Sequence, residues 1–175
     1  MKKTNAGRLA FNALLIAVNF VLGSYVALKL ANLKITFEAL PILIGALLFG
    51  PTDGLLIGLL GSFLSQLAGG YGLTVTTPLW ILPHALSGLV VGLYGRRLRG
   101  AFRYRDLLLI TAISAVLVTG LNTLALYVDA RIFGYYTRAP VFGTLALRIV
   151  VGVATAAAFS ALLPAILKPL RKMLK

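Results

Sequence analysis

Side chains able to do acid–base or metal chemistry are few in this sequence. It has four acidic residues, one histidine and no cysteine, which excludes a His-based metal cluster, thiolate ligands, a thiol nucleophile and a disulfide framework. The four carboxylates lie near the ends of apolar runs, so they cannot form a proton relay inside a membrane. Neither a serine nucleophile elbow nor a Walker A sequence occurs. The sequence therefore indicates binding rather than catalysis, with no cofactor and no metal.

Side chains suited to ligand recognition gather near the ends of apolar runs that would face the outside of a cell. Trp80 and the tyrosines among them have an alternative role as an interfacial aromatic belt. His84, Asn122 and Arg148 lie deeper, where polar groups are costly and usually functional. The candidate ligand-binding residues are Glu38, Tyr71, Trp80, His84, Asn122, Tyr127, Arg131 and Arg148.

Arg148 is the candidate that most clearly needs a partner of opposite charge. It lies well inside the apolar run 139–167, where a charged guanidinium needs an anionic partner. That partner is either an anionic group of a ligand or one of two carboxylates, Glu38 and Asp129. The sequence leaves both alternatives open.

Glu38 and His84 also have structural alternatives. Glu38 stands three residues before Pro41 in ITFEALPILIGALLFGPTDG, so it either faces a ligand or occupies a helix N-terminus, where the helix dipole favours a carboxylate. The GPTDG segment at the other end has the composition of a turn. His84 follows Pro83. Its imidazole either contacts a ligand or donates a hydrogen bond to a main-chain carbonyl of a helix.

The composition indicates that the solvent is lipid. The 175 residues are 59% hydrophobic and 12% charged, with a mean hydropathy of +0.95, whereas a soluble domain has about 25% charged residues. We expect an all-α integral membrane protein, a compact bundle of about six transmembrane helices in a single domain over 1–175. The apolar runs are 9–28, 39–50, 54–69, 79–95, 107–128 and 139–167.

The second and third runs are shorter than the roughly 20 residues that a spanning helix needs. Two arrangements are possible: six helices with a short, tilted second pair, or four spans plus a re-entrant hairpin over 39–69. The first run, 9–28, exceeds the 7–15 residues of a cleavable signal sequence, so we expect it to be retained as a span.

Basic residues predict the orientation. The charge of +13 is divided among the loops between apolar runs, as in a membrane protein, rather than gathered in a nucleic-acid-binding face. Twelve basic residues fall on the side of the N-terminus and four on the other, which places both termini on the cytoplasmic side of the membrane. The twelve are Lys2, Lys3, Arg8, Arg96, Arg97, Arg99, Arg103, Arg105, Lys168, Arg171, Lys172 and Lys175, and the four are Lys29, Lys34, Arg131 and Arg138.

Small residues recur at helical spacing and predict close helix contacts. For the glycines we expect packing inside the bundle. Ala13 and Ala17, four residues apart in ALLIA, either pack internally or offer a face to another protein. The glycines concerned are Gly54, Gly58, Gly61, Gly88, Gly92 and Gly95.

Over nearly its whole length the chain resembles the substrate-binding (S) components of energy-coupling factor (ECF) vitamin transporters. ALLIA in the first helix, PILIGALLFGP in the second and LNTLAL followed by LALRI further on are similar to the folate-type branch. The segment TVTTPLWILPHALSG departs from the Phe-rich segment expected there, so pantothenate or another small vitamin-like compound is the alternative ligand.

The resemblance implies that the chain binds its vitamin in an outward-side pocket capped by the loop between the first two helices. It also implies partners besides membrane lipid: a transmembrane coupling protein, for which Ala13 and Ala17 would be the contact face, and two ATPases whose hydrolysis makes the S component topple. A pterin would stack on Trp80 and the tyrosines, and a glutamate tail would pair with Arg131 or Arg148. The competing class is a small membrane protein without a transport role, such as an intramembrane enzyme or assembly factor.

Overall fold

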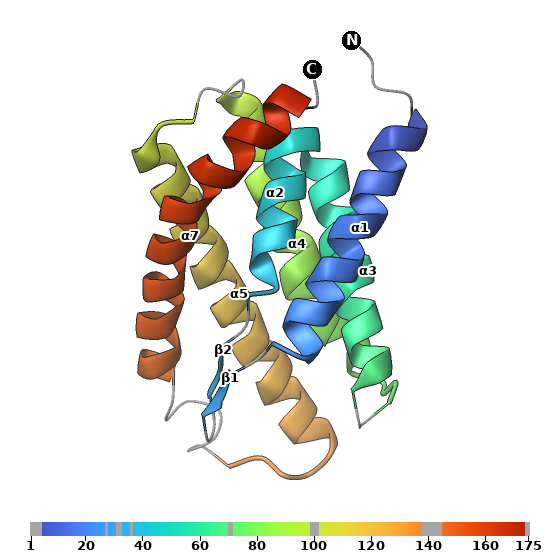
Figure 1. Ribbon diagram of the computed structural model, residues 1–175. Coiled ribbons are helices and arrows are strands. Elements are labelled where there is room, and N and C mark those ends of the chain that lie inside the picture. The colour runs from blue at the N-terminus through green and yellow to red at the C-terminus, as the bar shows by residue number, and fades with distance from the viewer. Residues whose placement is uncertain are drawn as a thin grey trace.

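The structure, a computed structural model, is a bundle of helices that run alternately up and down (Figure 1). It describes residues 5–26, 28–30, 33–35, 37–69, 72–98, 102–137 and 145–173. The predicted helical bundle is confirmed for this part of the chain, with one addition, a two-stranded hairpin. The elements are α1 (Asn5–Ser24), β1 (Leu28–Leu30), β2 (Leu33–Ile35), α2 (Ala39–Phe49), α3 (Pro51–Ala68), α4 (Thr77–Arg97), α5 (Tyr104–Ile132) and α7 (Leu145–Met173).

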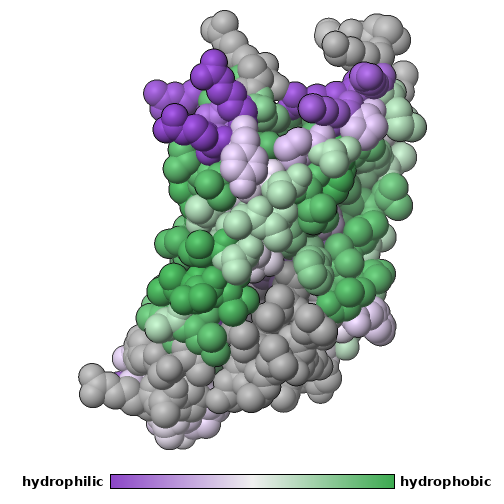
Figure 2. Space-filling model, turned by 60° about the vertical axis from the view of Figure 1, so that its left-hand side comes forward, coloured by the Kyte–Doolittle hydropathy of each residue, from purple (hydrophilic) through white to green (hydrophobic). Residues whose placement is uncertain are grey.

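The outer surface of the bundle is apolar. Large hydrophobic side chains such as Val150, Val116 and Leu14 are more than half exposed, and Figure 2 shows the apolar surface reaching a cap of hydrophilic residues at one end. Within the described residues four helices, α1, α4, α5 and α7, are long and apolar enough to cross a membrane. Helices that satisfy their own backbone groups and expose hydrocarbon side chains suit a lipid solvent.

The short helix α2 occupies the middle of the bundle. Seven of its eleven residues, Pro41 to Leu47, are buried, and they form much of the hydrophobic core together with side chains from α1, α3, α4, α5 and α7. Figure 1 shows α2 beginning near mid-height, whereas α3 extends through most of the bundle. Neighbouring helices therefore cover a segment that is too short to span a membrane alone.

The connection between α2 and α3 is tighter than the sequence predicted. We expected GPTDG to form a turn, but only Gly50 leaves the helical conformation, with φ +105°. Glycine tolerates this angle because it lacks a Cβ. Pro51 then starts α3, where a proline's missing N–H costs nothing.

The hairpin of β1 and β2 was not predicted. The two strands pair antiparallel, with Lys29 opposite Lys34. Three residues per strand are too few for an alternating pattern to be recognised against the long apolar runs around them. The hairpin lies at the end of the bundle opposite the termini (Figure 1), so it follows α1 on the side that basic residues assign to the outside.

At the end of the bundle that carries the termini, a charged contact joins α1 to α3. The Arg8 Nε donates to the Asp53 carboxylate over 2.8 Å, and Asn12 donates to the same group. Asp53, placed by the sequence in a turn, is a helical residue that is 4% exposed. Because a buried carboxylate needs such partners, this cluster fixes α1 against α3.

Glycines bring the backbones of α3 and α4 into direct contact, as predicted. A Cβ added at Gly54 would lie 2.5 Å from the Gly88 carbonyl oxygen, and one added at Gly88 would clash with the backbone of Gly54. Gly58 likewise leaves no room for a side chain beside the His84 carbonyl. In lipid, such close approach supplies the packing that hydrophobicity cannot.

Gly88→Ala is therefore expected to destabilise the protein by about 1–3 kcal/mol, the usual cost of overpacking, because the atom that it meets is backbone. Gly120→Ala is the matched control, since its Cβ would meet nothing within 4 Å, and it should hold or raise stability. Melting temperatures in detergent measure both variants. Equal melting temperatures for the two would contradict the close contact.

The orientation is tested by cysteine labelling in a chain that has no native cysteine. Arg105→Cys, at the end of the bundle that carries the termini, should react with an impermeant thiol reagent only after the cytoplasmic side is opened. Thr137→Cys, beyond the opposite end of α5, should react in intact cells. Both side chains are exposed. Labelling of position 105 in intact cells would reverse the proposed topology.

Candidate functional site

A cavity of about 470 Å³ lies among α2, α3, α4, α5 and α7. Its volume falls within the range of small-molecule sites, and its wall alternates apolar surface with hydroxyl, amide and charged groups. The lining residues are Glu38, Ala39, Leu43, Ser62, Ser65, Gln66, Trp80, His84, Thr111, Ser114, Ala115, Val118, Thr119, Asn122, Leu126, Arg148, Val151, Gly152, Thr155, Ala156 and Phe159.

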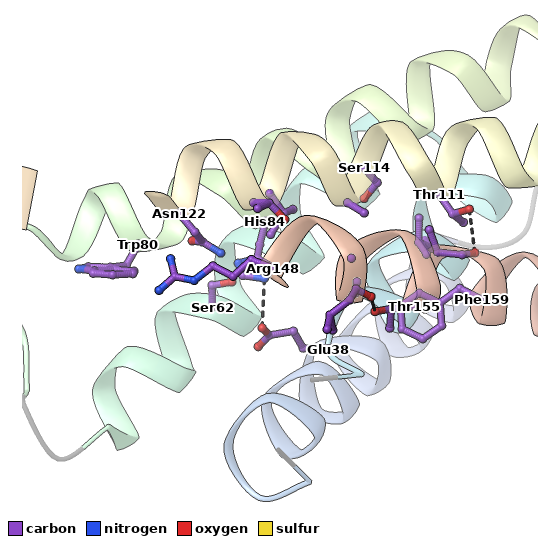
Figure 3. A pocket seen from close by; sticks show the side chains of 18 of the residues that line it. Glu38, Ser62, Trp80, His84, Thr111, Ser114, Asn122, Arg148, Thr155 and Phe159 are labelled. Carbon is purple, nitrogen blue, oxygen red and sulfur yellow. Dashed lines mark hydrogen bonds and ion pairs between the residues drawn. The ribbon is translucent and has the colours of Figure 1, made fainter. Parts of the chain in front are cut away.

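The cavity unites most of the predicted recognition residues, although they come from three helices and the residue before α2. Glu38, Trp80, His84, Asn122 and Arg148 all line it (Figure 3). Three predicted residues do not belong to this group. Tyr127 and Arg131 are not part of its wall, and Tyr71 lies outside the described residues.

Glu38 and His84 form a pair inside the cavity, drawn as a dashed line in Figure 3. The His84 Nε2 lies 3.2 Å from the Glu38 carboxylate, and both side chains are largely buried. Glu38 immediately precedes α2, as expected, but its carboxylate makes no capping hydrogen bond with the helix. The alternative of a helix-carbonyl partner for His84 is wrong, because Nε2 faces Glu38 and Nδ1 has no partner in the described structure.

Arg148 lies near the start of α7, half-buried and at the cavity wall. The structural ion pair with Glu38 or Asp129 that the sequence left open is not formed. Glu38 faces His84, and Asp129 accepts hydrogen bonds from Thr76 and Tyr135. No side-chain carboxylate pairs with Arg148 in the described residues, which include all four acidic residues of the sequence.

Further polar atoms at the cavity have no hydrogen-bond partner among the described residues. The Ser62 Oγ and the His84 Nδ1 are buried without a hydrogen bond within the described structure, and both residues line the cavity. Leaving such groups unsatisfied costs about 1–3 kcal/mol each. A bound molecule with matching donors and acceptors would recover that cost.

Arg131 has a different environment, near the end of α5. Its guanidinium carbon lies 4.4 Å from the ring centre of Tyr136 and 5.4 Å from that of Tyr127. Arginine stacked on aromatic rings in this way is stabilised by cation–π attraction. The arginine and tyrosine that the sequence placed in a ligand site therefore pack on each other.

The hydroxyl groups of the cavity wall were not predicted from the sequence. Thr111, Thr119 and Asn122 lie on one face of α5 together with Ala115 and Leu126, a spacing of three, four or eight residues that matches helical periodicity. Threonine in an apolar helix usually bonds to its own backbone, as Thr111 does to Leu107. The shared face with Asn122 was the signal that could have identified them.

The fold and the site define a class: an integral, multi-pass membrane protein whose helices enclose a polar cavity. The family model described as "ECF transporter, substrate-specific component" matches residues 7–173, so the chain belongs to this family. The predicted S-component identity is thereby confirmed.

Three relatives illustrate the match. A UPF0397 protein of Streptococcus pneumoniae (strain CGSP14) is 42% identical over 71 residues, which are 39% of this chain and 37% of the relative's length. The crystal structure of FolT bound with folic acid superposes with a TM-score of 0.65, at 20% identity over 87% of this chain and 90% of FolT. An S component for biotin gives a TM-score of 0.68, at 15% identity over 98% of this chain and 94% of the other.

At these identities the two solved structures show the shared fold alone. One binds folic acid and the other is an S component for biotin, so the fold does not discriminate between these vitamins. The folate branch suggested by the sequence therefore depends on the chemistry of the cavity.

Proposed function

We propose that the chain is the high-affinity vitamin-binding subunit of an ECF-type transporter and that it binds a carboxylate-bearing vitamin, folate above all, in this cavity. The whole chain, 1–175, forms one transmembrane domain of six spans with cytoplasmic termini. A coupling protein and two ATPase subunits supply the energy. The observation that carries the proposal is Arg148, a cation at the cavity wall with no carboxylate partner among the described residues.

A carboxylate of the ligand is the natural partner of Arg148. The planar guanidinium offers parallel N–H groups that match the two oxygens of a carboxylate. Inside a bundle the pair is shielded from water, so it contributes both affinity and orientation. Folate, pantothenate and biotin all carry a carboxylate, so Arg148 selects the class of ligand and not the individual vitamin.

The other cavity residues favour folate within that class. The Glu38 carboxylate can accept two hydrogen bonds from the amino and ring N–H groups of a pterin. The indole of Trp80 offers a face for stacking, and Asn122 supplies both a donor and an acceptor. Pantothenate has no aromatic ring and no paired ring N–H donors, which makes it the second candidate, together with other small vitamin-like compounds.

The experiment is a binding titration of the purified chain without ATP. Trp80 is the only tryptophan and lines the cavity, so its fluorescence reports occupancy directly. Folic acid should bind tightly, and more tightly than pantothenate, biotin, riboflavin or thiamine. Weak binding of all five, or turnover of any of them, would contradict the proposal and favour a membrane protein without a transport role.

Arg148→Met should weaken folic acid binding by about 2–5 kcal/mol, the cost of truncating a buried, hydrogen-bonded charge pair. The melting temperature of the ligand-free protein should change little, because no protein carboxylate is left without its partner. Titration and thermal unfolding of the same preparation measure both quantities.

Arg131→Met is the control, since Arg131 stacks on tyrosines and is not part of the cavity wall. It should keep the affinity of the unmodified chain. An unchanged affinity of Arg148→Met would remove Arg148 from the site, and a loss in Arg131→Met alone would assign the anion to Arg131.

The exposed alanines of α1 are the proposed contact with the coupling protein. Ala13 and Ala17 are both exposed on α1, next to the exposed side chains of Leu14 and Val18. Small residues four apart let a partner helix approach closely. The internal-packing alternative is wrong for the isolated chain.

Replacing Ala13 and Ala17 by leucine should abolish vitamin uptake in cells while leaving binding by the purified chain intact. The physical reason is that the added side chains block docking and do not reach the cavity. Leucines at Ala154 and Ala158, an equally spaced and exposed pair on α7, are the matched control and should preserve uptake. Normal uptake by the Ala13/Ala17 variant would refute the docking face.

A further inference from the structure

Two buried asparagines lie on one face of α1 and contact different elements of the bundle. Asn12 is 7% exposed and donates to the Asp53 carboxylate, whereas Asn19 is fully buried and donates from Nδ2 to the main-chain carbonyl oxygen of Glu38 over 2.5 Å. The two residues are seven apart, two helical turns along the same stripe. Asn12 therefore holds the end of α1 near the termini, and Asn19 binds Glu38, which lines the cavity.

The hydrogen bond of Asn19 depends on how α1 packs against α3 and the start of α2. Gly61 of α3 leaves the space that the Asn19 side chain fills, because a Cβ at Gly61 would clash with the Asn19 amide. The amide donor then reaches the carbonyl of the residue immediately before α2. A buried side-chain bond to the main chain fixes where that residue lies, whatever its own side chain does.

A second residue of α1 lies close to the carboxylate itself. Gly23 is buried, and a Cβ added there would overlap the Glu38 carboxylate oxygen. The absence of a side chain at Gly23 thus gives the carboxylate room to turn toward His84, which it meets at 3.2 Å. Residues of α1 therefore contact both parts of Glu38: Asn19 binds its main-chain carbonyl, and Gly23 lies beside its carboxylate.

We propose that Asn19 and Gly23 are positioning residues that hold Glu38 in the orientation in which its carboxylate binds the ligand. Neither residue lines the cavity, so both act only through Glu38. The inference rests on the proposed ligand-binding role of Glu38. It adds that α1, although it contributes no cavity residue in the described structure, sets the geometry of the site.

The first test compares Asn19→Ala with Asn12→Ala in titrations with folic acid, pantothenate and biotin. Asn19→Ala should weaken the binding of the compound that binds best by about three- to tenfold, as expected for one lost hydrogen bond. Asn12→Ala removes a buried amide from the same helix face and should leave affinity unchanged. Both variants should lower the melting temperature, so affinity separates positioning from a structural role.

Gly23→Ala provides a variant that keeps the fold, because the atom that it displaces is the end of a flexible side chain. It should weaken binding by about tenfold or more, the range for a hydrogen bond to a charged group. In a Glu38→Gln background the losses from Asn19→Ala and Gly23→Ala should shrink, since residues that act through one group are not additive. Full additivity would overturn the proposal.

A measurement without ligand separates this inference from the proposed function. Glu38→Cys keeps the carbonyl that Asn19 binds and introduces the only thiol of the chain. Its reaction with a small methanethiosulfonate should become faster when Asn19→Ala is added and stay the same when Asn12→Ala is added. Equal rates in all three proteins would overturn the positioning role. Failure of the three compounds to bind the unmodified chain, with the rates as expected, would instead refute the proposed ligand role and leave α1 as the element that positions residue 38.

Discussion

In hydrocarbon, every polar group that leaves water must find its partner inside the protein, and the arrangement of this bundle follows from that requirement. Asp53 is acceptable at 4% exposure because Arg8 and Asn12 reach it from α1. Ser87 and Ser114 meet at 2.6 Å between α4 and α5. A few polar contacts thus join α1 to α3 and α4 to α5, while many exposed side chains of the bundle are apolar.

At the cavity the same requirement is left unmet for several groups of the described residues. Arg148 has no carboxylate partner in the described structure, and Ser62 and His84 each have a buried atom without one. The glycine contacts make this possible, because Gly58 brings α3 against the backbone of His84. Close packing of α3 against α4 therefore fixes the main chain of His84, whose imidazole lines the cavity.

Periodicity and composition predicted the helices well, because in lipid the length of an apolar run and the length of a helix have the same cause. The run 79–95 becomes α4 over Thr77–Arg97, and 107–128 becomes α5 over Tyr104–Ile132. Depth in the apolar run also identified Arg148, since a charge there must have a function or a partner. The partners themselves could not be predicted. Whether Glu38 faces Arg148 or His84 depends on how helices far apart in sequence are placed, and no local pattern encodes it.

The first helix combines two properties that the sequence presented separately. Its exposed face carries Ala13 and Ala17, and its buried face carries Asn12 and Asn19. A rigid helix transmits displacement along its axis, and Asn19 lies less than one turn from Ala17. A partner that docks on the exposed face therefore contacts the same helical turn that holds the carbonyl of Glu38. Any shift of α1 relative to α2 would thus alter the position of the carboxylate that we propose as a ligand contact.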